Sequence, residues 1–480
     1  MQASLPPQGL DPPIARRISA HRPSLGDALF ARPQHVVPQL APKSDPCRQK
    51  DSAIPASRRI LAANRRQIGF MTIRNLFPSV RAVSARFSPR SAAPVVAAVP
   101  EAPAHRHPPV EIPVCDPGPD ALACERRRAR GQFLARQEDW EQLATEIATA
   151  EAERRLTPGL RSAAALLAEG ARRDMTVAIA EAVARGKPRE VQAAVAALEP
   201  LLAEMPACPV IAQVVAMVHV ETARAWRAAR DTNAPAIDRE AAFARHMATA
   251  TRLNDRFDPF ELQSPLWAVV RCAVLEADPA PQDRVADDFE DLIDLDPGNP
   301  WHMWQLGKAL RPARFGSWEQ LDAQARRTAA RTGDLWGNGG YAWIYLGALC
   351  EEAGAFARLD AELFVEGLHD ILTRHPTQDM ANRMAALVGH TLGGPTRAGS
   401  TRRRVADCLG WIAQDHLREL HPQVWAEVPE RRSGGKLGRR AAAPGEARAL
   451  DCLAEFYGPA LEAGRRVQFG PDGMRMIKGD

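Results

Sequence analysis

The sequence predicts an all-α protein, built as a superhelix of stacked antiparallel helical hairpins behind a long N-terminal tail. Windows rich in Ala, Leu, Arg and Glu dominate from about residue 120 onward, and these residues favour helices. No alternating run of β-branched residues is bounded by turn residues, so we expect no strands. Prolines recur at positions where helices would end, because the residue before a proline disfavours α geometry.

These prolines give the repeat its length, roughly 36 to 53 residues, which is typical of an α-solenoid. The interval between Pro297 and Pro376 is twice the others, and Gly333 provides a helix stop near its middle. In a solenoid each hairpin buries its apolar face against the next one. An irregular helical domain without repeats would also fit this spacing. The prolines are Pro158, Pro206, Pro259, Pro297, Pro376 and Pro422.

Residues 1–118 are expected to form a disordered tail, because they hold nearly half of the prolines and lack sustained periodicity. Residues 52–100 contain eight arginines and no acidic residue. Met71 lies in this window and is an alternative start of the chain. An arginine-rich segment without acids also suits a mitochondrial presequence, but its distance from Met1 argues against that interpretation.

The helical body is expected over residues 119–426, and we predict seven hairpins in it. They are 120–137 with 138–156, 160–186 with 188–205, 209–230 with 237–255, 262–276 with 282–295, 300–311 with 317–332, 339–353 with 355–374, and 378–392 with 400–420. Ser317 or Gly316 is the expected cap of its helix. Residues 427–446 are predicted to be a basic, glycine-rich loop. Residues 447–480 are predicted to hold a capping helix and then a loose polar tail from 466.

One segment carries a family resemblance. Trp343-x-x-Leu346-Gly347-x-x-Cys350 resembles the W-x-x-L-G-x-x-Y pattern of tetratricopeptide repeats, with Cys in place of Tyr. Forty residues earlier the chain repeats a Leu-Gly pair that ends in Gly307. The resemblance implies a right-handed superhelix with a concave binding surface. It also implies that Gly347 lets the two helices of one hairpin approach closely.

The resemblance places candidate binding residues on the first helices of these units, where half of the tryptophans of the chain lie within 43 residues. Aromatic and arginine side chains are favoured binding anchors, although each aromatic residue could equally belong to the core. Lys308 and Arg311 beside an aromatic floor would suit an acidic or C-terminal carboxylate group. The candidates are Trp301, Trp304, Lys308, Arg311, Tyr341, Glu351 and Asn382.

Motifs of known chemistry are weak in this chain. Residues 337–342 match the dinucleotide pattern G-x-G-x-x-G/A, but a helix end precedes them where the pattern requires a strand. Residues 434–437 lack the Ser/Thr that a phosphate loop needs. The histidine pairs His369/His375 and His416/His421 are not spaced for one helical face, and each ends in His-Pro at a predicted helix end. We therefore predict no catalytic residues, no metal site and no cofactor.

The distribution of charge and the cysteines limit the classes of partner and the compartment that we expect. Residues 1–130 hold 20 Lys/Arg against 9 Asp/Glu, whereas the other 350 residues hold 42 against 49, so a basic tail precedes a mildly acidic body. The eight cysteines form no C-x-x-C motif and are interpreted as small core residues in a reducing compartment. No apolar run is long enough to cross a membrane, and no signal peptide is visible. We expect a cytoplasmic protein.

The sequence favours a non-enzymatic scaffold that holds a protein or peptide partner on its concave surface. A first alternative is a small-ligand-binding protein or enzyme with a pocket lined by the aromatic residues of 301–345. A second is an adaptor that docks on nucleic acid or a membrane surface through its basic tail or through residues 431–440. That loop segment has five basic residues and no acid, but lacks the interleaved aromatic residues of nucleic-acid sites.

Overall fold

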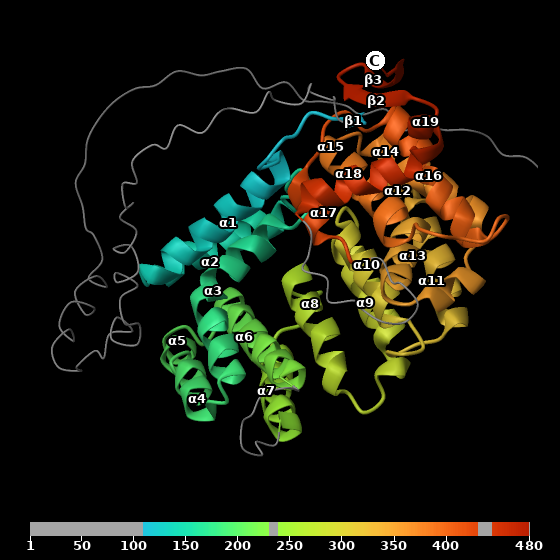
Figure 1. Ribbon diagram of the computed structural model, residues 1–480. Coiled ribbons are helices and arrows are strands. Elements are labelled where there is room, and N and C mark those ends of the chain that lie inside the picture. The colour runs from blue at the N-terminus through green and yellow to red at the C-terminus, as the bar shows by residue number, and fades with distance from the viewer. Residues whose placement is uncertain (1–108, 230–238, 431–443, 480) are drawn as a thin grey trace, which may run out of the picture. The chain divides into compact units, whose positions relative to one another are not determined.

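The computed structural model describes residues 109–229, 239–430 and 444–479, and these are mostly helical with a small three-stranded sheet (Figure 1). All of them fall within the compact unit Val80–Asp480. The predicted tail up to residue 108 and the basic segment 431–440 lie outside the described residues. No helix of the described part is both long and apolar enough to span a membrane.

The helices follow one another along the chain with short connections. The first group is α1 (Pro119–Arg136), α2 (Trp140–Ala152), α3 (Ala163–Ala184), α4 (Pro188–Ala196), α5 (Glu199–Glu204), α6 (Pro209–Ala228), α7 (Arg239–Asn254), α8 (Pro265–Val274) and α9 (Val285–Leu295). The second is α10 (Pro300–Ala309), α11 (Trp318–Arg331), α12 (Gly333–Trp336), α13 (Gly339–Glu351), α14 (Ala361–Arg374), α15 (Gln378–Ala385), α16 (Thr401–Asp415), α17 (Pro422–Glu427), α18 (Gly445–Phe456) and α19 (Gly458–Glu462). Short 3-10 segments are η3 (Leu275–Ala277), η4 (Pro281–Asp283) and η5 (Ala353–Ala357), and η6 (Ala386–Thr391) continues α15 as a π-helix.

Helices lie over each of the predicted helical segments, and the segment 188–205 is divided into α4 and α5. The short helices α12 and α17 were not predicted. Side-chain caps explain many of the helix starts, since each oxygen accepts a hydrogen bond from a backbone N–H of the first turn. Ser317 is the cap of α11 and accepts from the Gln320 amide at 3.2 Å, as predicted. The other caps of this kind include Ser162, Ser264, Asp360, Thr377 and Ser400.

The repeated glycines lie where helices cross. A Cβ atom at Gly347 would lie 2.1 Å from the carbonyl oxygen of Trp304, so α13 touches the backbone of α10 there. The prediction that Gly347 lets the two helices of one hairpin approach closely is therefore wrong, since the helix it approaches belongs to the preceding hairpin. Gly347 faces the first helix of the preceding hairpin, because a side chain at this point would prevent the two first helices from approaching.

The same crossing recurs between α1 and α3. A Cβ atom at Gly131 would lie 2.0 Å from the carbonyl oxygen of Leu167, and one at Gly170 would lie 2.0 Å from that of Arg128. In both crossings each glycine lies against a backbone carbonyl of the other helix. The residue with that carbonyl precedes the glycine of the other helix by three positions. Two first helices of successive hairpins thus approach in one register at two places in the chain.

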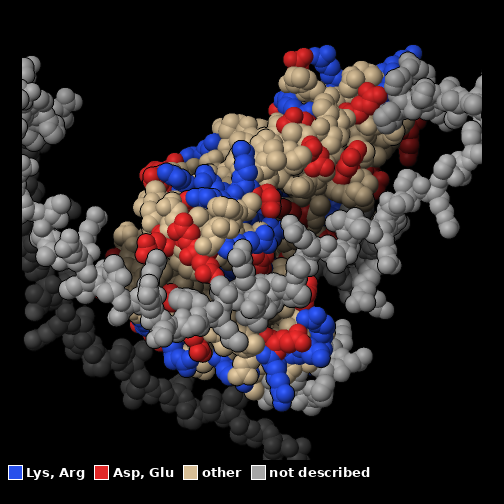
Figure 2. Space-filling view, turned by 90° about the vertical axis from the view of Figure 1, so that its left-hand side faces the viewer, with Lys and Arg blue, Asp and Glu red and all other residues tan. Residues whose placement is uncertain are grey.

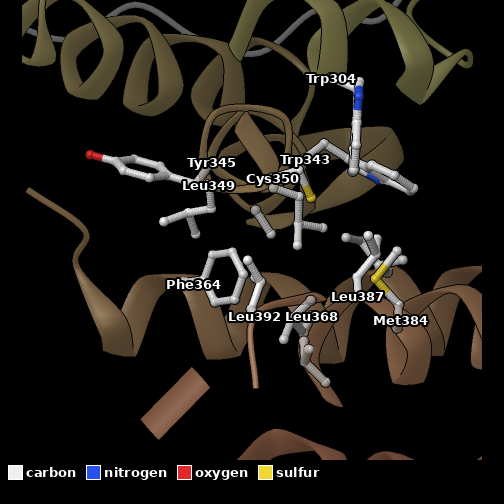
Figure 3. Packing of buried hydrophobic residues seen from close by; sticks show 14 of the residues in the cluster. Trp304, Trp343, Tyr345, Leu349, Cys350, Phe364, Leu368, Met384, Leu387 and Leu392 are labelled. Carbon is white, nitrogen blue, oxygen red and sulfur yellow. The ribbon is translucent and has the colours of Figure 1, made fainter. Parts of the chain in front are cut away.

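The largest core cluster joins α9 to α16 and includes most of the aromatic side chains of residues 301–345. Figure 3 shows Leu349 of α13 on the side that faces Phe364 of α14, whereas the Tyr345 ring points sideways. Two further clusters lie around α6 and α7, and around α1, α2 and α3. The seven cysteines of the described part form no disulfide, and five of them are buried, which agrees with their interpretation as core residues.

The C-terminal tail is a β-hairpin, so the prediction of a loose tail is wrong. Strand β2 (Arg465–Gly470) pairs antiparallel with β3 (Gly473–Lys478), and Gly473 turns the chain with a φ of +116°. Strand β1 (Val110–Glu111) pairs parallel with β2, Val110 lying opposite Val467. The structured part therefore begins before residue 119, and residues 109–118 do not belong to a disordered tail. The Pro-Asp-Gly turn at 471–473 was a local signal for this hairpin.

Candidate functional site

An open groove runs along α6, α8, α9 and α10, with a volume of about 520 Å³. Its walls combine apolar side chains, such as Leu292 and Phe315, with four cations. The cations are Arg224, Lys308, Arg311 and Arg314. We call this surface the basic groove.

Glu276 is the central acid of the basic groove and is shared by three arginines. Its carboxylate lies 2.9 Å from Arg224, 2.9 Å from Arg314 and 3.5 Å from Arg227. Arg227 also lies 3.5 Å from Glu240, so these three guanidinium groups share two carboxylates and keep an excess of one positive charge. That excess favours an anionic occupant of the groove.

Three of the predicted binding residues meet at this groove. Lys308 Nζ lies 2.7 Å from Glu351 Oε1, and Arg311 lies 3.8 Å from Glu352. Arg311 Nε also donates to the Lys308 carbonyl at 2.9 Å. Arg311 therefore satisfies a carbonyl near the end of α10 while its side chain lines the groove.

The other predicted residues do not lie on the basic groove. Tyr341 is fully buried, and its hydroxyl accepts a hydrogen bond from the Asp360 amide at 2.9 Å and lies 3.2 Å from Asp322. Burial raises the pKa of Tyr341 to about 12. Trp304 belongs to the core at 9% exposure, and Trp301 packs against it as a partly buried residue.

Asn382 is fully buried, and its amide is hydrogen-bonded on both sides. It donates to the carbonyls of Gln378 and Glu419, both at 2.8 Å. It accepts from the His421 amide at 3.0 Å and from Trp425 Nε1 at 2.9 Å. The side chain thus ties α15 to the segment leading into α17.

Most aromatic residues of 301–345 belong to the core, whereas Phe315 lines the basic groove. Trp336, Trp343 and Tyr345 are each at most 1% exposed. The Trp343 ring contacts Trp301 at 5.8 Å and Trp336 at 6.3 Å between ring centroids. Trp301, at the end of this row, lies beneath Arg161 and Arg383, and these two arginines line a second pocket.

This second pocket was missed by the sequence analysis. It has a volume of about 510 Å³ and lies where the starts of α1, α15 and α17 come together; α1 and α17 are side by side in Figure 1. Four of its charged or ionisable residues are 5% exposed or less: Asp120, Asp379, Arg383 and His421. We call it the polar pocket. Its residues come from distant segments, so no local pattern could have brought them together.

His421 links the polar pocket to a group that could hold a metal ion. It was expected to end a helix, but it precedes the first residue of α17. Cys115, Glu419 and His421 place one ligand atom each within 4.8 Å of one another. Burial lowers the pKa of His421, but the carboxylates of Asp379 and Glu419 outweigh it and raise the pKa above its ordinary value. Because a metal ion binds the neutral imidazole, it would compete with the proton for His421.

The glycine-rich segment 337–342 begins in the turn between two helices, and its residues 339–342 are already part of α13. Residues 337 and 338 connect α12 to α13, and Gly337 has a φ of +56°. The Asn338 amide donates to the Asp370 carboxylate at 2.7 Å, so the turn already holds an anion from within the chain.

Basic and acidic side chains are intermixed on the face shown in Figure 2, without a broad patch of one sign. That face offers no extended track for a phosphate backbone. The chain matches no protein-family model, no curated protein and no solved structure.

Proposed function

We propose that this protein is a non-enzymatic scaffold that binds an acidic protein or peptide segment in the basic groove. The observation that carries the proposal is the sharing of Glu276 among three arginines beside an apolar wall. An acidic side chain or a C-terminal carboxylate would receive charge-assisted hydrogen bonds from the excess cations. Apolar neighbours in the peptide would cover Phe315 and Leu292.

We also propose that the helices form a divergent, tetratricopeptide-like right-handed superhelix. The support is the shared register of the two crossings, Gly131 with Gly170 and Gly307 with Gly347. Recurrence of one close approach in successive units is expected of stacked repeats. The short α12 and the divided α4–α5 are departures from a regular hairpin.

The ion pairs already present in the groove do not oppose this function. Side chains of Lys308 and Glu351 are 34% and 29% exposed, and pairs of this kind contribute about 0–1 kcal/mol. An incoming carboxylate can therefore join or replace Glu351 at little cost.

Selection of peptides from a random library on the full chain tests the scaffold proposal. We expect selected peptides to be enriched in Asp and Glu, and their affinity to fall as salt rises. Lys308→Ala with Arg311→Ala should weaken binding about tenfold, which corresponds to about 1.4 kcal/mol. Arg185→Ala with Arg403→Ala, two exposed arginines of other surfaces, should leave binding unchanged.

Peptides without acidic enrichment, or equal binding by both double variants, would show that the groove is not the binding surface. A loss of melting temperature in Lys308→Ala with Arg311→Ala, together with unchanged binding, would assign Arg311 to capping of α10 alone.

A further inference from the structure

We propose that the polar pocket binds a small zwitterion with an ammonium and a carboxylate group, the class of free amino acids. The inference concerns a site separate from the basic groove and does not depend on the scaffold function. It rests on two groups of buried side chains of opposite charge that lie next to each other.

The anionic group consists of Asp120 and Asp379. A Cβ atom at Gly159 would lie 2.5 Å from Asp120 Oδ2 and 2.7 Å from Asp379 Oδ2, so these oxygens are at most about 5 Å apart. Both residues are at least 95% buried. Two buried carboxylates at this distance repel each other unless a cation lies between or beside them.

The protein compensates these carboxylates only in part. Asp120 accepts the Gly159 N–H at 2.8 Å, and Cys124 Sγ lies 3.6 Å from its other oxygen. His421 Nδ1 lies 3.7 Å from Asp379, which is too far for a hydrogen bond, and His421 Nε2 lies 3.1 Å from Glu419. One imidazole thus lies between two carboxylates, and Asp379 Oδ2 makes no hydrogen bond within the protein. A ligand ammonium would supply the missing donors and charge.

The cationic group consists of Arg161 and Arg383, which lie over the ring of Trp301 at 4.7 and 4.8 Å from its centroid. Both guanidinium groups share Glu427, at 2.8 Å from Arg161 and 3.4 Å from Arg383. Arg383 Nε is buried and makes no hydrogen bond. Two cations with one carboxylate have room for a second anion, and the guanidinium fork suits a carboxylate.

The two groups are neighbours because Trp301 Nε1 donates to the Gly159 carbonyl at 3.3 Å. Asp379 and Arg383 also stand one turn apart on α15. An ammonium at the aspartates and a carboxylate at the arginines would then be separated by a few bonds, as in an amino acid. The volume of about 510 Å³ leaves space for a side chain.

Titration calorimetry of the full chain with each of the standard amino acids tests the inference. We expect at least one to bind. Its decarboxylated amine and its deaminated acid should each bind at least about tenfold more weakly, because each satisfies only one group. Zinc chloride serves as a separate probe, since a metal at Cys115, Glu419 and His421 would bind without an amino acid.

Asp379→Asn and Arg383→Gln should each reduce affinity for that amino acid at least about tenfold. The matched control is the exposed pair of α16, at which Asp407→Asn and Arg403→Gln should leave affinity unchanged. Asp379→Asn should melt at the same temperature as the wild type or higher, because it removes the repulsion between the carboxylates of Asp120 and Asp379. That repulsion costs stability and is relieved only when the ligand ammonium binds. If it does not fold, Asp120→Asn takes its place.

Three results would overturn the inference: no amino acid binds, the Asp379 and Arg383 variants bind as the wild type does, or one of the half-analogues binds as tightly as the amino acid. If zinc binds and none of the amino acids does, the zwitterion is likewise rejected. The double variant Lys308→Ala with Arg311→Ala should keep amino-acid binding. A failure of the proposal for the basic groove can therefore be distinguished from a failure of the proposal for the polar pocket.

Discussion

Gly307 and Gly347 face each other at the crossing of α10 and α13. A Cβ atom at Gly307 would lie 1.9 Å from the carbonyl oxygen of Ile344, and one at Gly347 would lie 2.1 Å from that of Trp304. The atoms in the way belong to the backbone, which cannot rotate aside as a side chain can. This contact joins two successive hairpins through their first helices.

Gly347→Ala should therefore destabilise the protein, even though alanine favours helices. Overpacking costs about 1–3 kcal/mol, and the gain in helix propensity offsets at most about 1 kcal/mol. Chemical denaturation gives the measurement, and Gly170→Ala at the α1–α3 crossing should behave alike. Gly333→Ala is the control, because nothing lies within 4 Å of its Cβ position. An unchanged midpoint for Gly347→Ala would mean that the two helices are farther apart than described.

Strand β1 precedes α1 and pairs with β2, so we expect it to contribute to the stability of the protein. A chain that begins at residue 105 should melt as the full chain does. One that begins at residue 119 should lose about 2 kcal/mol or more, because it lacks buried Val110 and the pairing with β2. Thermal melting by circular dichroism distinguishes them. Equal melting of the two shortened chains would show that β1 adds nothing to stability.

A buried histidine pair makes stability depend on pH. His219 Nδ1 and His246 Nδ1 lie 3.1 Å apart, and burial lowers the pKa of each to about 4; the neighbouring imidazole adds to the effect at His219. The unfolded chain binds these protons near pH 6.5 and the folded chain only near pH 4. Stability from the pair is thus complete above pH 6.5 and is lost as pH falls toward 4.

We expect a loss on the order of 1–2 kcal/mol per imidazole between pH 7 and pH 5. His219→Gln with His246→Gln should flatten this part of the stability curve. His375 and His416, whose pKa values burial also lowers, remain in the variant and provide the residual slope. If the double variant keeps the full slope, the pair is not the source.

Substitution of Asn382 tests whether this residue has a structural role or a binding role. Asn382→Ala removes four hydrogen bonds within the protein, and the groups left unsatisfied should cost at least about 2 kcal/mol. Gln320→Ala, on the exposed side of α11, should cost little. Denaturation midpoints give both values. Stability equal to the wild type in Asn382→Ala would favour the binding role that the family resemblance implies.

Local sequence determined the helices of this protein. Caps such as Ser317 and stops such as Pro376 act within a few residues, so the bounds of most helices were predictable from the chain. The hairpin at residues 465–478 carried a local turn signal too. The family resemblance indicated Lys308 and Arg311 as binding residues, and both line the basic groove.

Only the tertiary structure decided which surfaces these helices bury and which residues they bring together. The sequence marked Gly347 as a close-contact residue, but its partner helix depends on how hairpins stack. Strand β1 pairs with a segment more than 350 residues later. Asp120 lies near Asp379, which follows it by about 260 residues. Such contacts produce no periodic pattern in the sequence. Periodicity reports which face of a helix or strand is buried, but not which distant residue packs against it.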